Sequence, residues 1–264
     1  MGLNCEGEYK MKNKKNERLG QVNTNRYGSK MTIIRYENNR NVKVEFEDGY
    51  RKKCEYKDFR KGIIRNPYDK SVYERGFLGE GPYKTSIGGK QTAEYDVWRG
   101  ILQRIYDDKS LRKFPTYKGC SICWEWHSFQ NFAEWYNNNY YEIPGEKMHI
   151  DKDILIKRNK IYSPNTCIFV PERINYLFVK TDHKRGKYPI GVSFDKTNNK
   201  FIVQLKNEQC EKIFMGRFST EKEAFNAYKN RKEKVIKNVA NRHKNQIPKK
   251  LYNAILNYVV EIDD

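Results

Sequence analysis

Two stretches of this chain alternate apolar and polar residues, and that alternation limits the fold more than any other sequence feature. In the first stretch, apolar residues at 42, 44 and 46 alternate with charged residues at 43, 45 and 47. A period of two is typical of a half-buried strand, and the Asp48-Gly49 pair that follows is a hairpin turn signal. The second stretch is residues 190–217. It predicts three more strands, at 190–194, 200–205 and 211–217. We therefore expect two separate antiparallel sheets.

Helical patterns fill the middle of the chain and follow the second sheet. Apolar residues from Tyr95 to Ile105 recur at helical spacing, and residues 129–136 repeat that pattern. Thr220-Glu-Lys-Glu223 is a capping box, which predicts the start of a helix after the last strand. Apolar spacing from Pro248 to Val259 predicts a final helix.

The pattern predicts an α+β protein made of several modules. Glycine and proline punctuate residues 66–90, and residues 181–186 are hydrophilic, so both segments are expected to separate modules. We expect a small antiparallel β-sheet or barrel, a central ββα core with two added helices, and a three-stranded sheet plus helix. The predicted segments are a basic arm at 1–26, a β module with its linker at 27–90, a core at 91–179, a second sheet domain at 180–247 and a C-terminal helix at 248–264.

The distribution of charge points to a polyanionic partner. The net charge of +19 divides into +9 over residues 1–90, +1 over 91–179, +12 over 180–250 and −3 over 251–264. Basic proteins gain affinity for DNA or RNA because each neutralised phosphate releases counterions. Tyrosine and phenylalanine are interleaved with the cations, as stacking residues would be. The alternative is that lysine only keeps the surface hydrated.

The six cysteines are scattered, which is typical of reduced thiols rather than of a disulfide framework. Only Cys120 and Cys123 have the spacing of a zinc ligand pair, and the chain has no second pair of this kind. Cys167 with His127 or His149 could complete a zinc site. The alternative interpretation is that these are small buried apolar side chains.

The chain carries no pattern of a membrane or secreted protein. No apolar run approaches the ~18–20 residues that span a bilayer, and residues 1–16 lack the apolar region of a secretory signal. We expect a soluble, cytoplasmic protein that does not bind membranes.

The segment from Gly145 to Asn175 concentrates the residues that could carry chemistry. It is predicted to form a strand at 149–156, a return strand starting at 161–162, and a helix that opens at Pro171 and runs to Phe178. The polar side chains of this segment could together hold a divalent cation and activate water, or they could be a set of turn and cap residues. The side chains concerned are His149, Asp151, Asp153, Asn159, Asn165 and Asn175.

Residues 188–239 resemble the plant APETALA2 (ethylene-response-factor) DNA-binding domain. The resemblance is carried by Ile190-Gly-Val192, Lys200-Phe-Ile-Val203, Phe214-Met-Gly-Arg-Phe218, Thr220-Glu-Lys-Glu-Ala224 and Ala227-Tyr228. It implies that the three-stranded sheet lies in the major groove of DNA. The Arg-Gly-Val-Arg start and the second-strand Trp of the plant family are missing, so its target sequence is not carried over. The DNA-contacting candidates are Lys196, Lys200, Gln204, Lys206, Lys212 and Arg217.

The middle of the chain is similar to bacteriophage HNH homing endonucleases, in which modules of this kind follow a nuclease core. The matching residues are Tyr95-Asp-Val-Trp98, Pro115-Thr-Tyr-Lys-Gly-Cys120, Trp126–Trp135, Ile150–Leu155 and Tyr162–Cys167. The resemblance implies an HNH-like hairpin and helix that grip one Mg²⁺ or Mn²⁺ ion.

Mapped residue by residue, the HNH resemblance makes His149 the general base that activates water. Asn165 would orient that base from the return strand, and Asn175 would ligate the metal. Met148 occupies the position of a family ligand and offers no hard oxygen donor, so Asp151 or Asp153 would substitute for it.

Two functions follow from these resemblances. The first is a metal-dependent HNH DNA endonuclease of phage type, working in the bacterial host cytoplasm and targeted by its C-terminal domain. The alternative is a catalytically degenerate DNA-binding protein that regulates transcription or acts as a phage counter-defence inhibitor of a host nucleic-acid enzyme. In that case the N-terminal module would dock a host protein.

Overall fold

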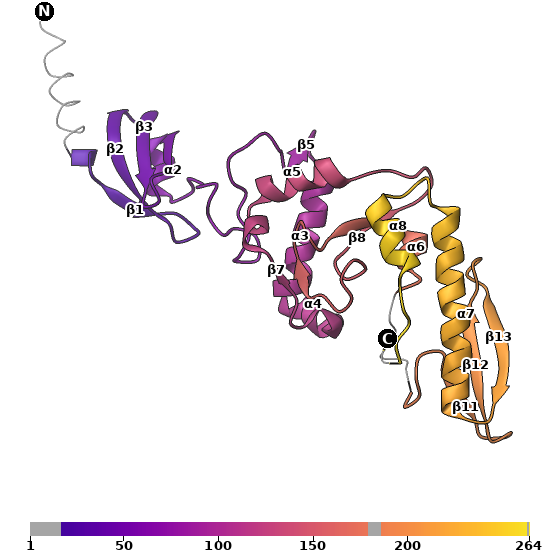
Figure 1. Ribbon diagram of the computed structural model, residues 1–264. Coiled ribbons are helices and arrows are strands. Elements are labelled where there is room, and N and C mark those ends of the chain that lie inside the picture. Colours follow the sequence, from indigo (N-terminus) through magenta and orange to yellow (C-terminus); the bar gives the residue numbers. More distant parts are fainter. Residues whose placement is uncertain (1–16, 179–185, 263) are drawn as a thin grey trace, which may run out of the picture. The chain divides into compact units, whose positions relative to one another are not determined.

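The computed structural model describes residues 17–178, 186–262 and 264, and the chain is a mixed α+β protein with several small sheets (Figure 1). It divides into two compact units, one of residues 1–118 and 122–136, the other of residues 119–121 and 137–264. Most of the basic arm predicted at 1–26 lies outside the described residues. Across the described ranges, no helix is long and apolar enough to cross a membrane.

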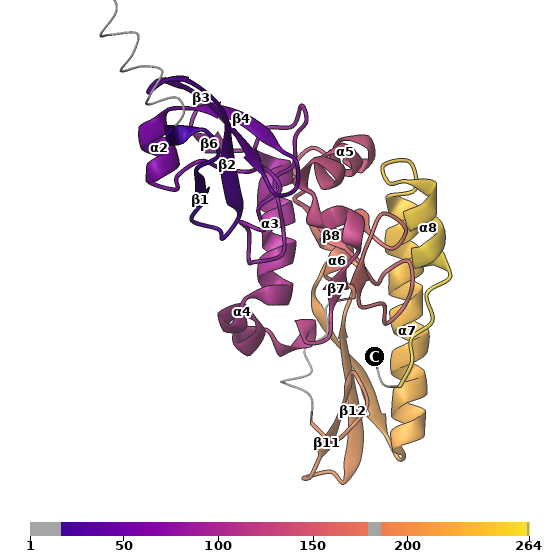
Figure 2. The same cartoon turned by 90° about the vertical axis from the view of Figure 1, so that its left-hand side faces the viewer.

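The first unit begins with a four-stranded antiparallel sheet in the order β1-β2-β3-β4, with a short helix, α2, beside it (Figure 2). The strand expected at 42–46 is confirmed. One face of the sheet buries Met31, Ile33, Val42, Val44 and Phe46 together with Phe59 of α2. The elements are β1 (Val22–Thr24), β2 (Lys30–Asn38), β3 (Asn41–Phe46), β4 (Arg51–Cys54) and α2 (Tyr56–Arg60).

A buried polar network ties the loop after α2 back to this sheet. The Asp69 side chain is 5% exposed, and its Oδ2 accepts hydrogen bonds from Asn25 Nδ2 at 2.7 Å and from the Asn66 backbone N at 3.1 Å. Asn66 Nδ2 in turn donates to Asp48 Oδ2 at 2.7 Å. Gly62 packs against β1 so closely that a Cβ there would lie 2.6 Å from the Thr24 carbonyl oxygen. These contacts join the loop after α2 to the sheet.

The rest of the first unit is helical around an aromatic core, as the sequence predicts. Trp98, Trp126, Phe129 and Phe132 are buried, and the Trp98 indole donates a 2.7 Å hydrogen bond to the Trp126 carbonyl oxygen. The elements are β5 (Ser86–Ile87), β6 (Lys90–Gln91), α3 (Ala93–Tyr106), α4 (Asp108–Lys113), the 3₁₀ turns Pro115–Tyr117 and Trp124–His127, and α5 (Phe129–Asn139).

Two short strand pairs and a one-turn helix precede the larger sheet, and every residue of these elements except Ile122 belongs to the second unit. β8 pairs with β10 in an antiparallel arrangement, whereas β9 pairs with β7. The predicted return strand at 161–162 is therefore not the partner of the His149 strand. The partner is β10, which leads directly into α6. The elements are β7 (Ser121–Ile122), β8 (Met148–Asp151), β9 (Ile161–Tyr162), β10 (Ile168–Pro171) and α6 (Glu172–Asn175).

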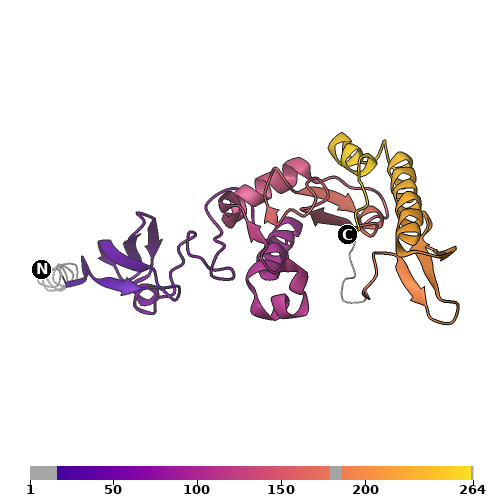
Figure 3. The same ribbon diagram turned by 60° about the horizontal axis from the view of Figure 1, so that its bottom comes forward.

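The last part of the chain is a three-stranded antiparallel sheet, in the order β11-β12-β13, with the long helix α7 along one face (Figure 1). The predicted capping box is confirmed, because Thr220 Oγ1 accepts from Glu223 N and Glu223 Oε2 accepts from Thr220 N, both at 3.2 Å. α8 packs against α7, and the two helices lie side by side in Figures 2 and 3. The elements are β11 (Val192–Asp195), β12 (Lys200–Lys206), β13 (Lys212–Phe218), α7 (Glu221–Arg242) and α8 (Lys249–Leu256).

Candidate nucleic-acid interface and histidine pair

The β11–β13 sheet has one buried face and one open face. Val203 and Leu205 of β12 are 0% and 6% exposed and belong to the core that includes α7. Because side chains alternate along a strand, residues 200, 202, 204 and 206 lie on the opposite face. The register pairs Ile202 with Arg217, Gln204 with Phe214 and Lys206 with Lys212, so these β13 residues share the open face.

Five of the six predicted DNA-contacting residues therefore lie on one face. A register shift between Val203 and Gln204 places the extra residue on β13, and this keeps both Phe214 and Arg217 on the open side. The sixth residue, Lys196, is exposed in the turn between β11 and β12. The residues gathered on the face are Lys200, Gln204, Lys206, Lys212 and Arg217.

An aromatic ring stands among these cations. Phe214 is 53% exposed, and the Arg217 guanidinium lies 5.5 Å from its ring centroid. Arg217 Nε is also 3.3 Å from Asp195 Oδ2. Hydrogen bonds from Asn198, together with Arg217, hold the pKa of the Asp195 carboxyl below its usual value. The Arg217 side chain is thus oriented across the face by a carboxylate on one side and a ring on the other.

The second group of candidate residues centres on His149 of β8. His149 lies opposite Val170 in the β8–β10 register, and its Nε2 is 3.2 Å from Glu172 Oε1 at the start of α6. The two side chains are 32% and 36% exposed, so solvent reaches the pair. The Glu172 backbone N donates to the Lys147 carbonyl oxygen at 2.8 Å, which fixes the helix start against β8.

Glu172 was not among the residues that the sequence analysis selected. The available signal was its position directly after Pro171, at the start of a helix predicted to follow the strands. Its carboxylate also accepts a 3.4 Å hydrogen bond from the Tyr176 hydroxyl.

Asp151 ends β8 by capping the turn that follows it. Its Oδ1 accepts hydrogen bonds from the backbone N of Asp153 at 2.8 Å and of Ile154 at 2.7 Å. The predicted strand at 149–156 is therefore wrong beyond Asp151, because this side chain turns the backbone. Burial, and then the nearby Asp153 carboxylate, raise the pKa of Asp151 to about 6. Asp153 itself is exposed and pairs with Lys152 at 3.0 Å.

The three asparagines of this segment lie in different environments. Asn165 is exposed in the turn before β10 rather than on a strand, and its backbone oxygen accepts from Lys250 Nζ at 3.3 Å. Asn175 is the half-buried last residue of α6, which is shorter than the predicted helix to Phe178. Asn159 is a turn residue whose Nδ2 donates to the carbonyl oxygens of Lys152 and Ile161, both at 2.7 Å.

A divalent metal ion would need several side-chain donors of this segment to converge on one point. In the parts of the chain that the structure describes, no three His, Cys, Asp or Glu side chains gather as they would around a metal. One oxygen of Asp151 is engaged by two backbone N–H groups, and Met148 offers only a thioether. Burial raises the pKa of the Cys123 thiol to about 11 and that of Cys167 to about 12.

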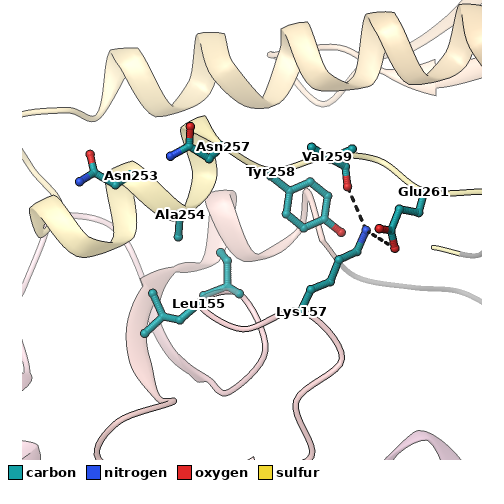
Figure 4. A pocket seen from close by; sticks show the side chains of 9 residues that line it. Leu155, Lys157, Asn253, Ala254, Asn257, Tyr258, Val259 and Glu261 are labelled. Carbon is teal, nitrogen blue, oxygen red and sulfur yellow. Dashed lines mark hydrogen bonds and ion pairs between the residues drawn. The ribbon is translucent and has the colours of Figure 1, made fainter.

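An open cavity of about 400 Å³ lies between the 154–157 turn and α8 with the segment after it (Figure 4). Its cation, Lys157, is already engaged, because Nζ donates to the Val259 carbonyl oxygen at 2.9 Å and lies 3.0 Å from Glu261 Oε2 and 2.7 Å from Asp264 Oδ2. The described residues that line this cavity thus present no free cation to a ligand.

No family model, no curated protein and no solved structure matches this chain.

Proposed function

We propose that this protein binds double-stranded DNA through the open face of the β11–β13 sheet. The observation that carries the proposal is the placement of Lys200, Lys206, Lys212 and Arg217, with Gln204 and the exposed Phe214 ring, on one face whose reverse is covered by α7. The excess of +12 over residues 180–250 supports a polyanionic partner.

The chemistry of these side chains supports a groove-binding surface. Strands can enter the major groove of B-DNA, and Arg and Gln are side chains that read base edges there. Lysines at the ends of β12 and β13 suit backbone phosphates, which position the protein without reading sequence. An exposed ring such as Phe214 suits the methyl group of thymine. We assign phosphate contacts to the lysines, and base contacts to Gln204, Phe214 and Arg217.

The test is the salt dependence of duplex binding by a fourfold variant, Lys200→Gln, Lys206→Gln, Lys212→Gln and Arg217→Gln. Each lost phosphate contact lowers the slope of log K against log salt by ~0.9 in magnitude, and the variant removes the phosphate contacts of the three lysines. We therefore expect the magnitude of the slope to fall by about 3. Near 0.15 M salt we expect a ~100-fold or greater loss of affinity. The matched control removes four exposed cations of α7: Lys222→Gln, Lys234→Gln, Lys237→Gln and Arg242→Gln. Equal losses in the two variants, or no loss in the first, would contradict the proposal.

A second candidate function is hydrolysis of a phosphodiester bond at His149. The observation that favours it is the His149–Glu172 pair. This pair links β8 to α6, the helix that directly follows β10, the partner strand of β8. A histidine held by a carboxylate can take a proton from water, and the carboxylate stabilises the imidazolium that results. Among the described residues no three His, Cys, Asp or Glu side chains gather as metal ligands, so the role proposed for His149 is proton transfer alone.

Nicking of supercoiled plasmid with Mg²⁺ or Mn²⁺ tests this second function. Wild type is expected to nick, and His149→Ala is expected to lose that activity while its DNA affinity stays unchanged. Equal nicking by both proteins would remove His149 from the mechanism. No nicking by wild type on any duplex would leave a DNA-binding protein without nuclease activity, which is the alternative expected from the sequence.

A further inference from the structure

Three cations stand side by side across the N-terminal sheet. The register places Arg35 of β2 opposite Lys43 of β3, and Lys43 opposite Lys53 of β4. Directly paired residues of neighbouring strands have Cβ atoms ~5 Å apart. The sheet therefore carries a row of like charges, which we call the cation row.

The cation row lies on the outer face of the sheet. Val42 and Val44 on either side of Lys43 are fully buried in the core of this unit, so Lys43 points the other way. The Arg35 side chain is 70% exposed, and Lys53 is exposed as well. Because strands lie ~4.8 Å apart, the row extends over about 10 Å.

Cations in this arrangement repel one another, and of the two nearby carboxylates one is engaged off the row while the other pairs only with Arg35 of the row. Glu45 faces Arg51, whose Nε and Nη2 both lie 3.1 Å from Glu45 Oε1. Glu37 pairs with Arg35 at 2.6 Å and also accepts from Asn41. For Lys43 and Lys53, the described residues provide no ion pair. Like charges placed directly opposite destabilise strand pairing, so this sheet face favours an anion from outside the chain.

We infer that the cation row binds the phosphate backbone of nucleic acid, at a surface separate from the open face of β11–β13. Duplex DNA presents one negative charge per ~1.7 Å of its axis, so a 10 Å row meets several phosphates. The neighbouring row of Val22, Thr32, Glu45 and Arg51 provides no aromatic ring, and its one aliphatic side chain is the exposed Val22. Protein interfaces depend mainly on large anchors such as Trp and Tyr, and Val is under-represented among them, which favours a phosphate backbone over an acidic protein as the partner.

The test uses the full chain with Lys43→Gln and Lys53→Gln together. We expect the slope of log K against log salt for duplex binding to fall by about 2, since each phosphate contact contributes ~0.9. We also expect hydrogen exchange over residues 30–54 to slow or stay unchanged, because a repulsion inside the sheet is removed. The matched control is Lys61→Gln with Lys70→Gln, two exposed lysines of the same unit that lie off the sheet.

Each other outcome overturns the inference. Slower exchange with an unchanged slope would make the row a hydrated surface only. Loss of binding to polyglutamate without loss of DNA binding would identify an acidic protein segment as the partner. An equal fall in slope for the control pair would show that only net charge matters.

The same double variant in the background of the fourfold β12–β13 variant separates this inference from the proposed function. A further loss of slope in that background supports the cation row even if the open face of β11–β13 proves not to bind DNA.

Discussion

Glu172 Oε1 lies 3.2 Å from His149 Nε2, and the two residues are 23 positions apart in the chain. The contact follows from the strand register, because Val170 is opposite His149 and Glu172 comes two residues later, at the first turn of α6. A neutral imidazole carries one ring proton, and a carboxylate can only accept. Glu172 therefore selects the tautomer with the proton on Nε2, and Nδ1 is the nitrogen that can accept a proton.

Replacing Glu172 by alanine is expected to remove that selection. In wild type, we expect long-range nitrogen–proton NMR spectra at neutral pH to show neutral His149 predominantly as the Nε2–H form. In Glu172→Ala, both tautomers should be populated. Wild-type spectra in which Nδ1 carries the proton would show that Glu172 does not orient the ring. If the nuclease proposal is correct, the same variant should nick ~100-fold more slowly, the lower end of a typical acid–base contribution of about 10²–10⁴-fold.

Asp151 is expected to make the second unit less stable as the pH rises through about 6. Burial and the Asp153 carboxylate raise its pKa from 3.8 to about 6, so the folded state holds the proton more tightly than the unfolded chain does. This contribution to stability is fully present below about pH 4 and is lost as the pH rises through the folded pKa. Its size is on the order of 2–3 kcal/mol.

Asp151→Asn should remove this pH dependence while keeping the turn, because the amide Oδ1 can still accept from the N–H groups of Asp153 and Ile154. All four tryptophans lie in the first unit, so tryptophan fluorescence would not report on this region. Hydrogen exchange of residues 148–154, corrected for intrinsic rates between pH 4.5 and 7.5, measures the effect. A wild-type opening free energy that does not change across this range would contradict the prediction.

Gly191 is expected to tolerate no side chain. Its φ is +75°, and a Cβ at this position would lie 2.0 Å from Cδ2 of the buried Tyr228 ring. Gly191→Ala therefore combines backbone strain with overpacking, and we expect a loss of about 2–4 kcal/mol in the free energy of unfolding of the second unit. Thermal melts followed by circular dichroism measure it. Gly186→Ala, where an added Cβ meets nothing within 4 Å, is the control and should melt like wild type.

The sequence predicted the larger sheet well because its strands are long enough for alternation to be visible. Residues 200–205 correspond to β12, and the capping box at Thr220 marks the start of α7 within one residue. With those strand positions known, the alternation of side chains along each strand puts five of the six candidate DNA-contacting residues on one face.

The smaller hairpin was predicted less well because its strands are too short for a pattern to decide their pairing. β8 has four residues and β9 only two, and the partner of β8 is determined by packing rather than by chain order. Asp151 continues the alternation in the sequence, yet its side chain ends the strand by bonding the backbone. The His149–Glu172 contact depends on that register, so no local pattern could have predicted it.

Two phenylalanines on β13 are expected to have opposite roles. Phe214 is 53% exposed on the open face, whereas Phe218 lies opposite Phe201 and packs against the core beneath α7. Phe214→Ala should lower duplex affinity about tenfold, the ~1–3 kcal/mol of one base contact. The salt slope and the melting temperature should stay unchanged, because no phosphate contact and little buried area are lost. Phe218→Ala should instead lower the melting temperature through lost packing. A Phe214→Ala variant that binds DNA like wild type would show that the open face contacts only phosphates, and a large loss of stability would show that Phe214 is a packing residue.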